Sequence, residues 1–233
     1  EEIAYALGKD PLDVRRLNFY DGAARNATHY GQDVSGNIMA RIVDELEASS
    51  DYRARRARII AQNRDSEFVK RGIDLVPVKY GIGFSKKVMN QGAVLLVVYR
   101  DGSVHLNLGG TEMGQGLNTK ICQVVAEEFD IPLARVRITS TATDKVPNAS
   151  PTAGSTGTDL NGMAAVDAAR RIKRRLCEFA ADHWRVHEDE VTFRHDAIQV
   201  GPRVIAWREL IEKAYGDRIP LSATGFYRTP HIS

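Results

Sequence analysis

The sequence has few cysteines, few aromatic residues, little net charge and no long apolar run. Its two cysteines, Cys122 and Cys177, have no paired spacing, which favours reduced thiols in a cytoplasm over a disulfide framework and gives no support to a cysteine metal site. A net charge of +2 over 233 residues is too weak to recruit nucleic acid or a membrane by itself. The longest apolar run, 93–99, is strand-sized, whereas a membrane helix needs roughly 20 residues. What is left is a globular composition that identifies no partner.

The first 76 residues have the pattern of a helical connecting segment. Helices are predicted over 1–7, 12–19, 38–49 and 52–63. Gly8 ends the first of them, and Pro11 suits the start of the second. Because the chain starts inside an amphipathic helix without a methionine, we expect it to be a piece of a longer protein.

A run of arginines lies on the fourth predicted helix. Its members are Arg53, Arg55, Arg56, Arg58 and Arg64. No aromatic residues interleave for base stacking, and acidic residues flank the run on both sides. A solvated helix face is therefore the preferred interpretation, and an RNA-binding or scaffolding role is the weaker alternative.

From residue 77 onward the pattern changes to strands interspersed with helices. We expect strands at 78–85, 93–99, 104–108, 136–139, 191–193, 197–200 and 221–227, and helices at 111–129, 158–183 and 206–215. Two pairs of these strands have hairpin signals, one through Arg100-Asp101-Gly102-Ser103 and one through His195-Asp196. The pattern predicts an α+β fold: a helical N-terminal segment over 1–76, then a mixed α+β lobe over 77–233 with β-hairpins packed on helices.

The first informative stretch is Gly109-Gly110-Thr111-Glu112-Met113-Gly114-Gln115-Gly116-Leu117, between a strand and a helix. Its glycines allow close backbone approach to a ligand, and amide donors at a helix start favour an anion such as phosphate. The glycine spacing fits neither the dinucleotide fingerprint nor a Walker loop. Thr111 and Gln115 add side-chain donors, so we predict a polar, anionic and oxygen-rich ligand.

The second stretch is Pro147-Asn148-Ala149-Ser150-Pro151-Thr152-Ala153-Gly154-Ser155-Thr156-Gly157-Thr158-Asp159, which precedes the longest helix. Its hydroxyls and amides would be available to a polyanionic ligand at the helix N-terminus. The alternative is a surface linker with Thr158 as the N-cap, and spacing alone does not separate the two. Because two such loops precede helices in one lobe, we expect Gln115 and Ser155 to lie at a common cavity.

These two loops together resemble the molybdenum-binding part of the xanthine dehydrogenase and aldehyde oxidase family. The resemblance lies in 109–116 and in Val146-Pro147-Asn148-Ala149-Ser150-Pro151-Thr152-Ala153. The segment 6–18 is similar to the family helix that follows an arginine-bearing active-site loop, and Gly81-Ile82-Gly83-Phe84 is similar to its aromatic substrate clamp. The resemblance covers practically the whole chain and is closest in wording to bacterial xanthine dehydrogenases.

The resemblance implies a role for each matching residue. Gln115 would hydrogen-bond an oxygen of the molybdenum centre, with backbone contacts from Met113 and Gly114 to the pterin of molybdopterin. The pterin and its phosphate tail would be wrapped by Thr152, Ala153, Gly154, Ser155, Thr156, Gly157 and Thr158. Phe84 would stack on a planar purine, where its other interpretation is a core phenylalanine. No residue is implied as a direct metal ligand.

The reaction implied is that of xanthine dehydrogenase: hypoxanthine and xanthine are hydroxylated to urate, with water as the oxygen source. Electrons would pass through iron-sulfur clusters and FAD of a partner subunit to NAD, in a hetero-oligomer with the remainder of the molybdenum-binding subunit. The general-base glutamate is expected beyond Ser233, and Glu112 is not offered in its place because it lies in the cofactor loop. The isolated chain is therefore expected to be inactive.

Some positions depart from the usual family pattern. They are Gly83, Ser85, Gly154 and the pair Thr156-Gly157, where a change of size would alter the pocket. A related enzyme that oxidises aldehydes or other heterocycles is the alternative within the family, and a non-enzymatic module that binds a phosphate ligand is the alternative outside it. The histidines are scattered without ligand spacing.

Overall fold

The computed structural model describes residues 1–21, 25–29, 31, 33–145 and 149–230. The chain divides into two compact units, Glu1–Tyr80 and Gly81–Ser233, and each is described by itself. Among the described residues, no helix combines the length and the apolar character needed to cross a lipid bilayer.

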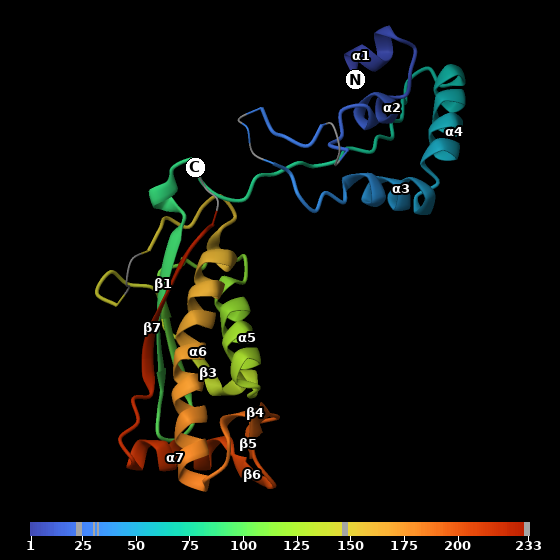
Figure 1. Cartoon of the computed structure of the whole chain (residues 1–233). Coiled ribbons are helices and arrows are strands. Elements are labelled where there is room, and N and C mark those ends of the chain that lie inside the picture. The colour runs from blue at the N-terminus through green and yellow to red at the C-terminus, as the bar shows by residue number, and fades with distance from the viewer. Residues whose placement is uncertain (22–24, 30, 32, 146–148, 231–233) are drawn as a thin grey trace. The chain divides into compact units, whose positions relative to one another are not determined.

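The first unit contains the four predicted helices (Figure 1). They are α1 (Glu2–Ala6), α2 (Pro11–Arg16), α3 (Met39–Ser49) and α4 (Tyr52–Asp65). Pro11 occupies the first position of α2, and the Asp10 carboxylate caps it by accepting a hydrogen bond from the Leu12 amide at 2.8 Å. The buried core of this unit is small and consists of Leu12, Val43, Tyr52 and Leu75.

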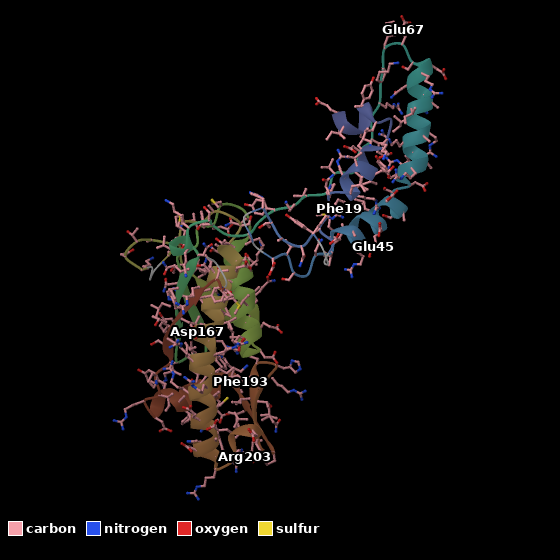
Figure 2. The ribbon with its side chains drawn as sticks, turned by 45° about the horizontal axis from the view of Figure 1, so that its top comes forward. Phe19, Glu45, Glu67, Asp167, Phe193 and Arg203 are labelled. Carbon is pink, nitrogen blue, oxygen red and sulfur yellow. The ribbon has the colours of Figure 1, made fainter. Side chains whose placement is uncertain are left out.

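Ion pairs join the helices around this small core, and Figure 2 shows the side chains that fill the space between α2, α3 and α4. Arg53 donates to Glu47 on α3 and to Asp13 on α2, the latter at 2.6 Å. Arg56 Nε lies 2.9 Å from the Asp10 carboxylate. Arg53 remains exposed, as predicted for a solvated arginine face. Arg56 is partly buried, because the Asp10 carboxylate, which lies far away in the sequence, comes within its reach.

The second unit is built on a four-stranded sheet with the strand order β3-β2-β1-β7. The strands are β1 (Gln91–Val98), β2 (Val104–Leu108), β3 (Val136–Ile138) and β7 (Ser222–Arg228). The predicted hairpin is confirmed, since β1 and β2 pair antiparallel with Leu96 opposite Leu106. The strand β3 runs parallel to β2, and β7 pairs antiparallel with the other edge of β1.

Two helices, α5 (Leu117–Phe129) and α6 (Gly157–Trp184), lie side by side along this sheet (Figure 1). Their buried faces meet the apolar residues of β1 and β2 in one core. Fully buried members of that core include Leu96, Leu106, Leu117, Ile121, Phe129, Ile172 and Leu176. The apolar side chains of the long helix α6 are therefore largely core, although Met163 is exposed.

A second sheet, β4-β5-β6, packs near the C-terminal end of α6 beside α7 (Figure 1). Its strands are β4 (Val191–Arg194), β5 (Ala197–Val200) and β6 (Arg203–Ala206), and α7 spans Trp207–Gly216. The short 3-10 helices η1 (Lys87–Met89), η2 (Leu133–Arg135) and η3 (Glu188–Glu190) complete the elements. The β4–β5 hairpin is confirmed, whereas β6 was not predicted from the sequence.

Two predicted elements of the second unit are wrong at the places that matter most for the loops. No strand forms over 78–85, where Val78 and Ile82 are largely exposed and Gly83 bonds to a loop instead of a neighbouring strand. The helix α5 begins at Leu117 and not at 111, because Gly114 and Gly116 adopt positive φ angles and the residues before Leu117 form a loop. The α+β fold class itself is confirmed.

Gly225 sets how closely β7 approaches α6. A Cβ atom built at this position would lie 1.9 Å from the Ala164 carbonyl oxygen and 2.6 Å from the Ala168 nitrogen. Both contacts are with the helix backbone, so neither can be relieved by rotating a side chain. Ala164 and Ala168 are themselves fully buried. The strand and the helix therefore pack backbone to backbone at this point.

Trp207 holds the far turn of the first hairpin. Its indole Nε1 donates to the Gly102 carbonyl at 2.7 Å, and the side chain is fully buried. Gly102 has a φ of +83°, and a Cβ there would make a tight contact of 3.0 Å with the indole ring.

Candidate functional site

Three segments far apart in the sequence meet at one end of the second unit. The Thr111 amide donates to Thr152 Oγ1 at 2.8 Å, which joins the two glycine-rich loops. The Gly83 amide donates to the Gly154 carbonyl at 3.0 Å, which joins the segment of Phe84 to the second loop. The two loops therefore touch each other, and the segment of Phe84 belongs to the same cluster. A cavity shared by Gln115 and Ser155 stays a prediction.

The first loop, 109–116, is closed by its own glutamate. The Glu112 carboxylate accepts hydrogen bonds from the amides of Gly114 at 2.9 Å, Gly116 at 3.0 Å and Asn118 at 2.9 Å. These amides are the donors that the sequence offered to an external anion at the start of α5. That expectation is wrong, because an acidic side chain of the same loop takes the place of the anion.

The hydrogen bonds to Glu112 also affect its acid–base behaviour. Donation by the amides of Asn118, Gly116 and Gly114, with a contribution from the charge of Lys120, lowers the pKa of this carboxyl. A general base that works near neutral pH needs a raised pKa, as burial provides in known acid–base enzymes. The geometry thus gives Glu112 a structural role in the loop, which agrees with the expectation that the general base is another glutamate.

Gln115 is exposed and is held in one orientation by the same loop. Its Oε1 accepts from the Met113 amide at 2.6 Å, and its Nε2 donates to the Thr111 carbonyl at 2.9 Å. A side-chain amide has two N–H groups, so one donor on Nε2 is left to face a ligand. Met113 is 66% exposed beside it. This part of the loop therefore presents a fixed hydrogen-bond donor.

The second loop leads into α6 through a tight turn. Gly154 and Ser155 both adopt left-handed φ angles, +61° and +57°. The buried Thr156 follows as the N-cap residue of α6, and its hydroxyl donates to the Ala153 carbonyl at 3.0 Å. The alternative interpretation with Thr158 as the N-cap is therefore wrong by two residues. The motif residues Val146, Pro147 and Asn148 lie outside the described part of the chain.

The start of α6 is open where that of α5 is closed. Within the described ranges, no residue accepts a hydrogen bond from the amides of Gly157, Thr158 or Asp159. Gly157 and Thr158 are partly buried, while Ser155 is exposed. Amide donors at the N-terminus of a 28-residue helix carry the positive end of its dipole, so this end favours an anionic ligand.

Phe84 is partly buried, and a buried asparagine holds its backbone. The Phe84 amide donates to Asn90 Oδ1 at 2.9 Å, and Asn90 Nδ2 donates to the Phe84 carbonyl at 2.8 Å. Asn90 is only 2% exposed. Sequence reasoning missed this residue, because nothing in the local pattern distinguishes it from its polar neighbour Gln91.

The described residues contain no cluster of three or more His, Cys, Asp or Glu side chains that could hold a metal ion. His231 lies outside the described part. The converging loops offer hydrogen-bond donors in the Gln115 amide and in the first amides of α6. Such a donor set suits an anionic, oxygen-rich organic ligand more than a bare cation.

Comparison with known proteins points to the same kind of ligand. Residues 45–233 match the family model of the molybdopterin cofactor-binding domain. The chain is 44% identical to "Xanthine dehydrogenase" of the fly Drosophila pseudoobscura pseudoobscura over 231 residues, which are 99% of this chain and 16% of that protein. It is 39% identical to "Xanthine dehydrogenase" of Dictyostelium discoideum over 232 residues, 100% of this chain and again 16% of that protein.

The fold also matches a solved structure. The reconstituted CO dehydrogenase from Oligotropha carboxidovorans superposes with a TM-score of 0.82 at 22% identity, over 98% of this chain and 31% of that one. Both xanthine dehydrogenase relatives named above are from eukaryotes, so the expected closeness to bacterial xanthine dehydrogenases finds no support in them. The chain spans about a sixth of the length of those relatives. The chain belongs to the molybdopterin cofactor-binding domain family, among the molybdenum hydroxylases of the xanthine dehydrogenase and aldehyde oxidase type.

Proposed function

We propose that the chain forms part of the molybdopterin site of a xanthine dehydrogenase, which hydroxylates hypoxanthine and xanthine to urate. The observation that supports this best is the convergence of the first loop, the second loop and the segment of Phe84 through the Thr111–Thr152 and Gly83–Gly154 hydrogen bonds. The substrate class is taken from the names of the two relatives, whose alignments cover 99 to 100% of this chain.

The residues present fit the cofactor. Molybdopterin is anionic, because it carries a phosphate, and its ring system offers several acceptors. The open amides at the start of α6 meet the first requirement, and the fixed Gln115 N–H meets the second. When bound, the cofactor supplies the redox-active metal that takes up the two electrons of the substrate carbon.

In this proposal the chain binds and orients. Gln115 donates its free N–H to an oxygen of the molybdenum centre, while Met113 and Gly114 line the pterin through their backbone. The second loop surrounds the pterin and its phosphate tail with Thr152, Ala153, Gly154, Ser155, Thr156, Gly157 and Thr158. The amides of Met113 and Gly114 are already used within the loop, so their contribution would come from their carbonyls and Cα groups.

The substrate would lie against Phe84. An aromatic ring that stacks on a planar purine contributes about 1–3 kcal/mol by the measure of bases stacked on aromatic side chains. The ring orients the purine and excludes water from one face. No carboxylate of the described residues is assigned as the general base, because Glu112 is committed to three backbone amides.

Electron transfer requires groups outside this chain. We propose that iron-sulfur clusters and FAD in a partner subunit or another part of the protein pass the electrons to NAD. The remainder of the molybdenum-binding subunit would complete the cofactor site. The two free cysteines, Cys122 and Cys177, agree with a cytoplasmic location, because reduced thiols persist there.

The test uses the complete enzyme that contains this chain. Gln115→Ala removes the donor aimed at the cofactor, so molybdopterin retention and kcat/KM for xanthine should fall about 10- to 100-fold, as expected for a hydrogen bond to a charged group worth roughly 1.5–3 kcal/mol. Molybdenum analysis of the purified protein and steady-state kinetics measure the two effects.

Gln123→Ala is the matched control for this test, because Gln123 is an exposed glutamine on α5, away from the loop. It should retain wild-type cofactor content and activity. Full cofactor content and unchanged xanthine turnover in Gln115→Ala would contradict the proposed cofactor role.

A further inference from the structure

Asn90 is one of three polar residues that are buried in the described part of the chain. Its side-chain amide makes three hydrogen bonds: it accepts from the Phe84 amide at 2.9 Å and donates to the carbonyls of Phe84 at 2.8 Å and Lys86 at 3.0 Å. Both N–H groups of Nδ2 are therefore used, and they face oxygens, while Oδ1 faces an N–H. Only asparagine offers this pattern at this length.

The bonds with Phe84 imitate a backbone pair. Asn90 binds both the N–H and the C=O of the same residue, as a neighbouring β-strand would do. This explains why Phe84 has a defined place although 78–85 does not form the predicted strand. The asparagine supplies the partner that the missing strand would have supplied.

Asn90 is itself held by the sheet. Its carbonyl accepts from the Thr229 amide at 3.1 Å, directly after β7. The next residue, Gln91, holds the second loop, because Ser150 Oγ donates to the Gln91 carbonyl at 2.7 Å. Asn90 and Gln91, at the start of β1, thus fix the position of the Phe84 segment relative to the second loop. The Gly83–Gly154 hydrogen bond also joins these two segments directly.

We propose that Asn90 is a positioning residue for the purine: it fixes Phe84 relative to the second loop, so that the ring meets the substrate at the correct height and tilt. This inference rests on the proposed function for its substrate. Asn90 touches neither substrate nor cofactor in this role. Its loss should weaken substrate binding through Phe84 and leave the cofactor in place.

The main test is a double-mutant cycle in the complete enzyme. Asn90→Asp keeps the shape but turns an oxygen toward two carbonyl oxygens, so KM for xanthine should rise about tenfold while kcat and molybdenum content stay within about twofold. In a Phe84→Ala background the same change should alter kcat/KM less than about twofold, because the aromatic ring that Asn90 positions is then absent. A purely structural defect would lower kcat and molybdenum content instead.

A second measurement does not depend on activity. Hydrogen exchange of the Phe84 amide should be about tenfold faster in Asn90→Asp, because repulsion between the new carboxylate oxygen and the carbonyls of Phe84 and Lys86 displaces the side chain that accepts from this amide. Ser150→Ala is the matched control: it removes the bond to the neighbouring Gln91 and should leave exchange at Phe84 slow. If Asn90→Asp does not accumulate as folded protein, Asn90→Ser takes its place in both experiments, with a smaller effect of the same sign.

The outcomes separate this inference from the proposed function. Independent, multiplicative effects of Asn90→Asp and Phe84→Ala on kcat/KM, or unchanged exchange at Phe84, would overturn the role of Asn90. A wild-type enzyme that binds no molybdopterin or does not oxidise xanthine would overturn the proposed function, and the exchange experiment would still decide whether Asn90 holds Phe84.

Discussion

The two loop–helix junctions of the second unit have similar residues but opposite electrostatics. Before α5, Glu112 satisfies the amides of Gly114, Gly116 and Asn118. Before α6, the described residues provide no acceptor for the first amides of the helix. Glycines and hydroxyls ahead of a helix are therefore not enough to identify an anion site. The presence of a carboxylate within reach of the same amides decides whether the junction is self-contained or open to a ligand.

This difference suggests that the two junctions have different roles in ligand binding. The α5 junction is rigid by itself and presents Gln115, whereas the α6 junction is completed by what binds to it. Four substitutions or conditions test this comparison, in order of decreasing expected effect.

The largest effect is expected for Glu112→Gln. A neutral amide still fits the space, but it offers one acceptor oxygen for three N–H groups, so the first loop should lose its fixed shape and Gln115 its orientation. Molybdopterin content of the complete enzyme should fall about tenfold or more. Glu127→Gln, an exposed glutamate on α5, is the control and should retain the cofactor. Normal cofactor content in Glu112→Gln would show that the first loop does not need this closure.

Gly154→Ala tests the second loop, and a smaller effect is expected. Gly154 has a φ of +61°, which costs an alanine about 1–2 kcal/mol, and the added Cβ would lie 3.1 Å from the Gly83 carbonyl oxygen. Thermal stability should fall, and KM for xanthine should rise because the segment of Phe84 is displaced.

Gly157→Ala is the comparison for this variant. Gly157 is helical, and its nearest neighbour would be Leu117 Cδ1 at 3.5 Å, an ordinary contact. The free energy of unfolding of Gly157→Ala should stay equal to that of the wild type or rise by up to about 1 kcal/mol, because alanine loses less backbone entropy on folding. Equal destabilisation by both alanines would show that the backbone conformation at Gly154 is not the cause.

Ser155→Asp would convert the open junction toward the closed type. An acid near the first turn of α6 interacts favourably with the helix dipole, so the cofactor-free protein should gain about 0.3–1 kcal/mol in the free energy of unfolding. The same charge should repel a phosphate and lower molybdopterin retention. Ser155→Asn provides a neutral control of similar size. A stabilised variant with undiminished cofactor would contradict an anionic ligand at this helix end.

The smallest effect concerns pH. Hydrogen bonds from the amides of Asn118, Gly116 and Gly114 hold the pKa of Glu112 below its ordinary value of 4.5, so its ionised form stabilises the folded loop above that pH. The stabilisation is lost as the pH falls below 4.5 toward the lowered pKa. The difference in melting temperature between wild type and Glu112→Gln should therefore be constant above pH 6 and shrink below pH 4.5, as calorimetry can measure. A constant difference throughout would show that the charge of Glu112 does not matter.

The sequence was informative where the interactions are local. The β1–β2 hairpin followed from two apolar runs around Asp101-Gly102, and α6 followed from the helical pattern over 158–183. The convergence of the two loops could be expected because each precedes a helix of the same lobe. The roles given to their residues came from the family resemblance and stay predictions.

The errors share a physical cause, since each depends on a contact that the local pattern does not contain. The stretch 78–85 has strand-like residues, but its hydrogen bonds go to Asn90 and Gly154. The early start assigned to α5 overlooked that Glu112 caps the helix from outside. The partial burial of Arg56 was not predicted, because its acidic partner Asp10 lies far away in the sequence.

Gly225, which lies outside the loops of the candidate site, affects the position of the α6 amides in that site. This residue allows β7 to touch the backbone of α6 at Ala164, about two turns from the point where the helix begins. A bulkier residue there would displace the helix outward, and the amides at its first turn would move with it. A variant at position 225 could thus impair cofactor loading in an enzyme whose loops are all intact, and a search for inactivating substitutions should include this strand.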